Sequence, residues 1–134
     1  MAKKKRRTVD EHVLRAFLDA FNRHDLDDIM DYFTEDCTFD MPKGSDSFGT
    51  RYRGKVRVRE GLATRFIGIP DVHYGEDRHF VSKSGDRGVS EWLLTGTTRA
   101  GEKIAVRGCD LFEFNKDGKI RVKDSYWKIV QPKI

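Results

Sequence analysis

The sequence has few cysteines and no long apolar run. Its 134 residues include only two cysteines, Cys37 and Cys109, which lie far apart in segments expected to be strands. No stretch approaches the roughly 18–20 apolar residues that cross a bilayer, and the basic N-terminus leads into no apolar signal-peptide core. These absences favour a cytoplasmic protein with free, buried thiols, without a membrane partner.

An excess of positive charge is also lacking once the first residues are set aside. Five of the 26 basic residues fall in "KKKRR", residues 3–7, which leaves 21 basic against 22 acidic residues from Thr8 onward. A nearly neutral folded part has no cationic footprint for nucleic-acid phosphates. We interpret residues 1–7 as a disordered basic tail, with a nuclear localisation signal or an electrostatic handle as the alternatives, and residues 8–134 as a single domain.

What the sequence does contain is a set of helical patterns followed by alternating ones. Apolar residues at helical spacing predict three helices, over residues 8–25, 25–33 and 55–68. A capping box of Thr8 and Glu11 opens the first. A short strand follows the second helix in "CTFDM", and a loop is expected from Pro42 to Gly54. Alternation and turn residues predict four long strands, over residues 72–81, 88–98, 102–114 and 119–130. Helices followed by a meander predict an α+β domain with a curved antiparallel sheet folded over the helices.

The order of these segments resembles the nuclear transport factor 2-like superfamily, and within it the ketosteroid isomerases and SnoaL-like polyketide cyclases. "FNRHDLDDIMDYFTEDCTF" is similar to the family's helix end, second helix and first strand, and "GCDLFEFNKDGKI" with "DSYWK" to its last hairpin. The resemblance covers nearly the whole chain after the basic tail. It implies a cystatin-like cone, with N-terminal helices packed on a curved antiparallel sheet, and a homodimer built on the exposed face of that sheet.

Asp110 is the strongest candidate for a catalytic residue. It alternates with Gly108, Phe112 and Phe114, so a carboxyl group lies on a strand face suited to burial. A buried carboxyl group must find a partner or take up a proton. The resemblance implies a neutral Asp110 that donates a hydrogen bond to a ligand oxygen, as the corresponding residue of ketosteroid isomerase does. The alternative is a carboxylate paired with an arginine or capped by backbone N–H groups.

The catalytic base is less well defined. Ketosteroid isomerase has an aspartate base directly before a proline at the end of its first strand, and "FDMP" places Met41 there, with Asp40 one residue earlier. Asp40 is a candidate base only if a β-bulge turns it inward; otherwise it is a solvated or salt-bridged acid. His79 is a second candidate, because histidine titrates near neutral pH, with surface or core packing as its alternative. His73 and His79 are an even number of residues apart, so simple alternation along the strand places both side chains on the same face.

Aromatic and apolar side chains are expected to line a pocket for an apolar, ring-bearing ligand. They are Phe17, Phe33, Met41, Phe66, Trp92, Phe112 and Trp127. By the resemblance, Phe17 replaces the oxyanion-hole tyrosine of ketosteroid isomerase, and Trp127 is its pocket aromatic. Because Phe17 and Met41 cannot ionise as the tyrosine and the aspartate base of that enzyme do, the chain is not expected to be a true ketosteroid isomerase. The expected function is proton transfer on an apolar carbonyl compound, in an isomerase, cyclase or dehydratase without metal or organic cofactor. The alternative is a non-catalytic ligand-binding or dimerisation module.

Overall fold

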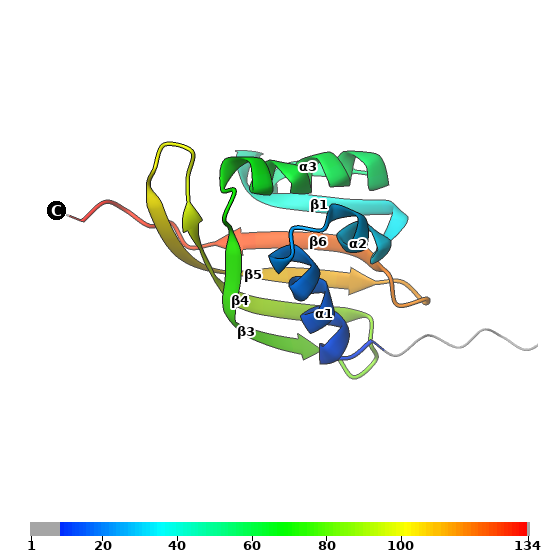
Figure 1. Cartoon of the computed structure of the whole chain (residues 1–134). Helices are drawn as coiled ribbons and strands as arrows, with labels where there is room; N and C mark the ends of the chain where they lie inside the picture. Colours follow the sequence, from blue (N-terminus) through cyan, green and yellow to red (C-terminus); the bar gives the residue numbers. More distant parts are fainter. Residues whose placement is uncertain (1–8, 134) are drawn as a thin grey trace, which may run out of the picture.

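Three helices lie on one face of a curved, open sheet of six strands (Figure 1) in the computed structural model, which describes residues 9–133. The elements are α1 (Glu11–Asn22), α2 (Leu26–Asp31), β1 (Phe33–Asp46), β2 (Gly49–Arg53), α3 (Lys55–Gly68), β3 (His73–Val81), β4 (Arg87–Thr97), β5 (Lys103–Phe114) and β6 (Ile120–Trp127). The strand order is β2-β1-β6-β5-β4-β3; β1 and β6 are parallel, and the other neighbours are antiparallel. The predicted α+β architecture is confirmed. Within residues 9–133, no helix is long and apolar enough to span a membrane.

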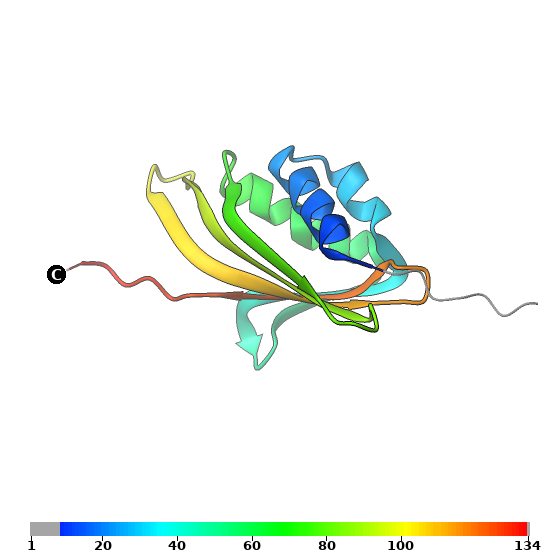
Figure 2. The ribbon, with the colours of Figure 1, turned by 90° about the horizontal axis from the view of Figure 1, so that it is seen from below.

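The segment from Pro42 to Gly54 forms part of a hairpin and not the predicted loop. β1 continues to Asp46, and β2 pairs back along it antiparallel. Gly49 has a φ of 79°, and a Cβ there would lie 1.9 Å from the carbonyl oxygen of Met41. The glycines that suggested a loop therefore permit a tight turn and close strands. The hairpin tip projects to the side of the sheet opposite the helices (Figure 2).

Helix α1 begins later than the capping box predicted. Its N-cap is Asp10, whose side chain accepts hydrogen bonds from the backbone N–H groups of His12 at 3.0 Å and Val13 at 3.4 Å. A carboxylate at this position satisfies free donors and faces the positive end of the helix dipole. Thr8 and the basic tail lie outside the described residues.

A β-bulge in β3 separates the two histidines that simple alternation placed on one face. The register with β4 shifts between Gly75 and Arg78, and Glu76 has a φ of 47°. The extra residue reverses the parity of the rest of the strand, so that His73 is exposed and His79 is buried.

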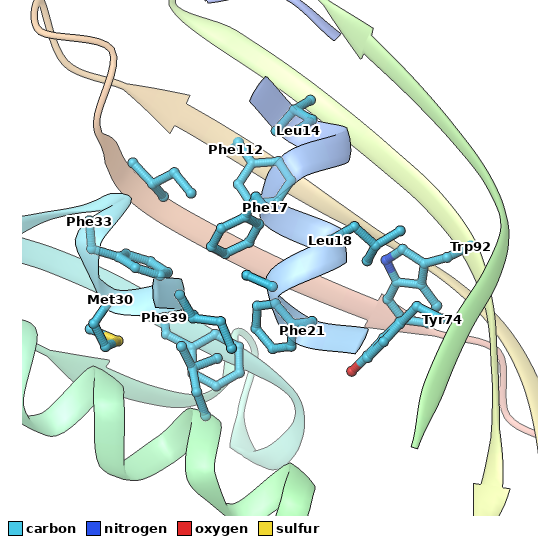
Figure 3. Close-up of a cluster of buried hydrophobic side chains, with 14 of the residues drawn as sticks. Leu14, Phe17, Leu18, Phe21, Met30, Phe33, Phe39, Tyr74, Trp92 and Phe112 are labelled. Atoms are coloured by element: carbon cyan, nitrogen blue, oxygen red, sulfur yellow. The ribbon is translucent and has the colours of Figure 1, made fainter. Parts of the chain in front are cut away.

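Aromatic rings fill the core between α1 and the sheet (Figure 3). Phe17 lies at the centre, and its ring makes edge-to-face contacts with Phe21, Tyr32, Phe33 and Phe112 at centroid separations of 5.1 to 5.7 Å. Such contacts add about 0.5–1.5 kcal/mol each beyond the burial of apolar area. Phe17, to which the resemblance assigned the place of an oxyanion-hole tyrosine, is therefore a packing centre of the core.

Gly108 allows β5 to pass directly beneath Trp92. A Cβ at position 108 would lie 2.4 Å from the carbonyl oxygen of Tyr126 and 2.6 Å from the indole ring of Trp92.

Gly108→Ala should therefore lower the free energy of unfolding, measured with urea, by about 1–3 kcal/mol, the range for overpacked cores. Gly68→Ala is the matched control, because no atom lies within 4 Å of a Cβ there, and its stability should be equal or higher. Equal losses in both variants would contradict the steric explanation.

Candidate functional site

A row of buried polar side chains crosses the sheet on the face that the helices cover. The strand registers place His79 opposite Ser90, Ser90 opposite Asp110, and Asp110 opposite Ser125. These four residues, here called the polar row, are only 2 to 6% exposed. Buried polar groups are costly unless they are hydrogen-bonded, so the partners of each member define what the row can do.

Asp110 accepts three hydrogen bonds and does not lie among apolar side chains alone. Trp92 Nε1 donates to Oδ2 at 3.0 Å, while Lys123 Nζ and Ser125 Oγ donate to Oδ1 at 3.1 and 2.5 Å. Both oxygens of Asp110 therefore act as acceptors, and the contact with Lys123 is a charge-assisted hydrogen bond. Asp110 is thus arranged as an acceptor, and not as the neutral donor that the resemblance implied. Its ionic partner is a lysine, where the alternative interpretation had considered an arginine.

Lys123 is a candidate functional side chain that the sequence analysis missed. It is buried, and its ammonium lies 2.9 Å from Ser125 Oγ, with the rings of Phe39 and Phe21 at 4.7 and 5.4 Å from Nζ. Burial lowers the pKa of Lys123 below its ordinary value of 10.5, although Asp110 acts in the opposite direction. The alternation of Lys123 and Ser125 with Trp127 along one strand was the signal available in the sequence.

His79 continues the polar row to the edge of the sheet. Its Nδ1 lies 2.8 Å from Ser90 Oγ, and its Nε2 lies 2.7 Å from Asp77 Oδ2. Because a carboxylate only accepts, Nε2 donates to Asp77, and Nδ1 of a neutral ring accepts from the Ser90 hydroxyl. Burial acts to raise the pKa of Asp77, but the hydrogen bond from His79 and a backbone N–H outweigh it, and the pKa is lowered. The Asp77 side chain is 26% exposed, so this chain of contacts begins near solvent.

Asp40 lies on the other face of the sheet. Both of its oxygens accept hydrogen bonds from Arg51, at 2.7 Å from Nε and 2.9 Å from Nη2, while the neighbouring Phe39 points into the core. The register shifts of β1 lie on either side of Asp40 and do not turn it inward. Asp40 is therefore the salt-bridged strand acid of the alternative interpretation and does not join Asp110.

Two small cavities meet at Lys123 in the interior. The first is lined by Phe17, Ser90, Asp110, Phe112 and Lys123 among others, and the second by Arg65, Trp92, Lys123, Ser125 and Trp127 among others. Each has a volume of about 10 Å³, which is roughly the space for one water molecule. Phe33, Met41 and Phe66, which were expected to line a pocket, pack against the core and line neither cavity.

Arg65 and Trp127 form the outer wall of the second cavity. The Arg65 guanidinium lies 4.2 Å from the Trp127 ring centroid, and Trp127 meets Trp92 edge-on at 6.5 Å. Both Arg65 and Trp127 are only partly buried. A cation–π contact at such a partly exposed site contributes about 0.5–1 kcal/mol.

The lowered pKa of Lys123 predicts how stability changes with pH. Between the folded-state pKa and the ordinary value of 10.5, the unfolded chain binds a proton that the folded chain has lost, so the free energy of unfolding rises with pH in this window. We measure the free energy of unfolding with urea and subtract the value for Lys123→Met from the value for wild type. This difference should become more positive as pH rises toward about 10, because only wild type has the buried lysine. Lys128→Met, at an exposed position, should show no such growth. A Lys123→Met difference that shrinks with pH would contradict the buried, destabilised ammonium.

Comparison with known proteins agrees with this architecture. Residues 14–122 match the family model of the SnoaL-like domain. None of the curated proteins matches the chain in sequence.

Among solved structures, a putative polyketide cyclase from Pseudomonas putida is 19% identical, with a TM-score of 0.78 over 89% of this chain and 91% of that one. SalBIII, described as an epoxide hydrolase/cyclase-like enzyme in pyran ring formation in the polyether salinomycin, is 19% identical, with a TM-score of 0.74 over 88% and 89%. RV0760c from Mycobacterium tuberculosis, in complex with estradiol-17beta-hemisuccinate, is 20% identical, with a TM-score of 0.75 over 90% and 96%. Proteins described as NTF2-like also match, and these likenesses establish the fold.

Proposed function

Because the chain belongs to the SnoaL-like domain family, we propose that it is a cofactor-independent enzyme that transfers a proton on a small apolar carbonyl compound. The reaction class is that of an isomerase, cyclase or dehydratase. The observation that carries the proposal is a carboxylate and an ammonium 3.1 Å apart within an aromatic interior, Asp110 and Lys123. Structural relatives described as cyclase-like, and one bound to a steroid ester, support a ring-bearing ligand.

In this proposal Asp110 is the base and Lys123 stabilises the oxygen. An ionised carboxylate shielded from water accepts a proton from the carbon next to the carbonyl group. A fixed ammonium beside it stabilises the negative charge that then develops on the carbonyl oxygen. Lys123 thereby supplies the donor that Phe17 cannot, since a phenyl ring has no hydroxyl group. The resemblance to ketosteroid isomerase implied the donor role for Asp110; the three donors around that carboxylate support the opposite assignment.

His79 has a supporting role, as a relay between Asp110 and solvent. The first cavity has room for about one water molecule between Ser90, Asp110 and Lys123, and three polar partners are typical for a buried water. A proton that Asp110 has taken up leaves through that water, Ser90 and His79, and it reaches Asp77 at the sheet edge. The hydrogen bonds of 2.8 and 2.7 Å on the two His79 nitrogens support this direction.

Ligand binding in this proposal requires the interior to open. Ligand pockets usually measure about 300–1,000 Å³, far more than the two cavities provide. The weak contact between Arg65 and Trp127 is the proposed entrance, because both side chains line the second cavity and are partly exposed. A ring-bearing ligand then takes the place of the Trp127 indole beside Trp92.

Exchange of α-hydrogens for deuterium tests the proposal without knowledge of the natural substrate. The protein in D2O is incubated with 2-tetralone, an apolar ring ketone with acidic α-hydrogens, and deuterium uptake is followed by NMR. Wild type should accelerate exchange over Asp110→Ala by about 100-fold or more, the usual contribution of a general base. Asp40→Asn should exchange like wild type, because Asp40 is equally buried, at 4%, but on the other face.

Three outcomes of this experiment are distinct. Exchange that survives in Asp110→Ala would remove Asp110 as the base. Loss in both variants would indicate a general effect on the fold. Binding of 2-tetralone to wild type without any exchange would favour the non-catalytic ligand-binding module instead.

We also propose that the chain forms a homodimer through the outer face of the sheet. Phe80, Leu111 and Tyr126 are 54, 40 and 52% exposed and lie on that face, beside charged groups such as Asp124. Exposed apolar side chains rimmed by polar ones are typical of an interface. Sedimentation at micromolar concentration should give a dimer for wild type and a monomer for Leu111→Glu. Ile67→Glu, at an exposed apolar residue on α3, should stay dimeric. A monomeric wild type would overturn the proposal.

A further inference from the structure

We propose that Lys123 is a nucleophile that captures the carbonyl carbon of the ligand as an imine, in addition to the ammonium form in which it rests. This inference builds on the proposed function and narrows the ligand class to aldehydes and unhindered ketones. The geometry points to it: a primary amine at the junction of two cavities, shielded from bulk water and hydrogen-bonded to a carboxylate and a hydroxyl group.

The position of Lys123 differs from that of every other lysine between residues 9 and 133. It is the one lysine of this part of the chain that is buried, and it lines both cavities. Its Nζ also lies 4.7 Å from the Phe39 ring centroid. A ligand that enters past Arg65 and Trp127 meets this nitrogen before it reaches the space under α1.

The Asp110–Lys123 pair can generate the neutral amine that imine formation requires. Within the 3.1 Å hydrogen bond, one proton moves from Nζ to Oδ1, which leaves an uncharged amine and an uncharged acid. Removal of both charges reduces the desolvation cost of the pair, and burial already lowers the pKa of Lys123. Ser125, at 2.9 Å from Nζ and 2.5 Å from Oδ1, orients both partners during this transfer.

The covalent step balances without any further reactant. The amine nitrogen attacks the carbonyl carbon, and the carbonyl oxygen takes the proton from Asp110 to give a carbinolamine. The nitrogen then passes a second proton through Asp110 to the hydroxyl group, which leaves as water. In sum, one ammonium and one carbonyl group give one iminium ion and one water, with Asp110 again a carboxylate. The charge of the buried pair is unchanged, so the iminium ion keeps its counter-ion.

The iminium ion would serve the proposed proton transfer directly. Its nitrogen withdraws electrons from the neighbouring carbon and acidifies the C–H bond that must break, as Schiff-base lysines do for carbonyl substrates. Asp110, hydrogen-bonded to the same nitrogen before the reaction, is the nearest described carboxylate to receive that proton.

Reductive trapping tests the inference independently of turnover. The full-length protein is incubated at pH 7 with benzaldehyde, which has no α-hydrogen, and sodium cyanoborohydride, and the modified lysines are located by peptide mass spectrometry. Lys123 should be alkylated faster than exposed Lys128, because burial lowers the pKa of Lys123 and a larger fraction of it is then free amine. Lys128→Arg should leave labelling of Lys123 unchanged. Asp110→Asn should slow it, because the group that carries protons from the nitrogen to the carbonyl oxygen is then lost, even though removal of the carboxylate lowers the pKa of Lys123 further.

The result that would overturn the inference is labelling confined to the exposed lysines while circular dichroism shows folded protein. That failure can be told from a failure of the proposed function. If wild type and Lys123→Arg exchange 2-tetralone equally well, proton transfer stands and the imine is wrong. If Lys123 is labelled and no exchange occurs, the imine stands and the proton-transfer proposal is wrong.

Discussion

The need to satisfy a buried carboxylate on β5 organises the interior of this protein. Asp110 lies on the same strand face as Phe112, in the region where the Phe17 ring fills the core, and water does not reach it freely. Each of its three donors comes from a neighbouring strand: Trp92 from β4, and Lys123 and Ser125 from β6. A slip of one residue between β5 and β6 would turn Lys123 and Ser125 to the outer face and leave the charge unpaired, and a slip between β4 and β5 would remove the Trp92 donor. The carboxylate therefore specifies the register of the central strands as well as the chemistry of the site.

Stability alone does not account for this pair. Buried ion pairs often contribute less than apolar side chains of the same volume, because desolvation of both charges is costly. The surrounding core has ample aromatic packing, with Phe17 alone in contact with four other rings. A lysine whose pKa is lowered by burial is a further departure from what stability would favour. Perturbed titratable groups that converge on a cavity are a recognised mark of a functional site.

Periodicity in the sequence predicted the elements, but not the contacts between them. The alternation around Asp110 correctly placed it with Phe112 on the inner face, and the α3 pattern matched the helix at Lys55–Gly68. Two local irregularities escaped this reasoning, the bulge at Glu76 that separates the histidines and the glycine turn that extends β1. Both depend on backbone conformations with positive φ, which apolar periodicity does not report.

The partner of Asp110 was not predicted from the sequence, for a different reason. Lys123 belongs to another strand, and the pattern of one strand contains no information on the register of its neighbour. A lysine at a position of inward parity, two residues before Ser125 and four before Trp127, was visible but unexplained until the pairing of β5 with β6 placed it beside Asp110.

The two acids that the sequence singled out are equally buried, and their partners explain why only one of them is suited to chemistry. Asp40 and Asp110 are each 4% exposed, and each forms an ion pair. Arg51 donates to both oxygens of Asp40, and this hydrogen bonding raises the pKa of the guanidinium above its ordinary value, so Arg51 does not give up its proton to Asp40. Lys123 offers a single nitrogen that donates to one oxygen of Asp110, and this nitrogen lies beside two cavities. In the proposed mechanism, the difference between a fixed ion pair and a proton-exchanging one is set by the choice of arginine or lysine, and by the face of the sheet on which the acid lies.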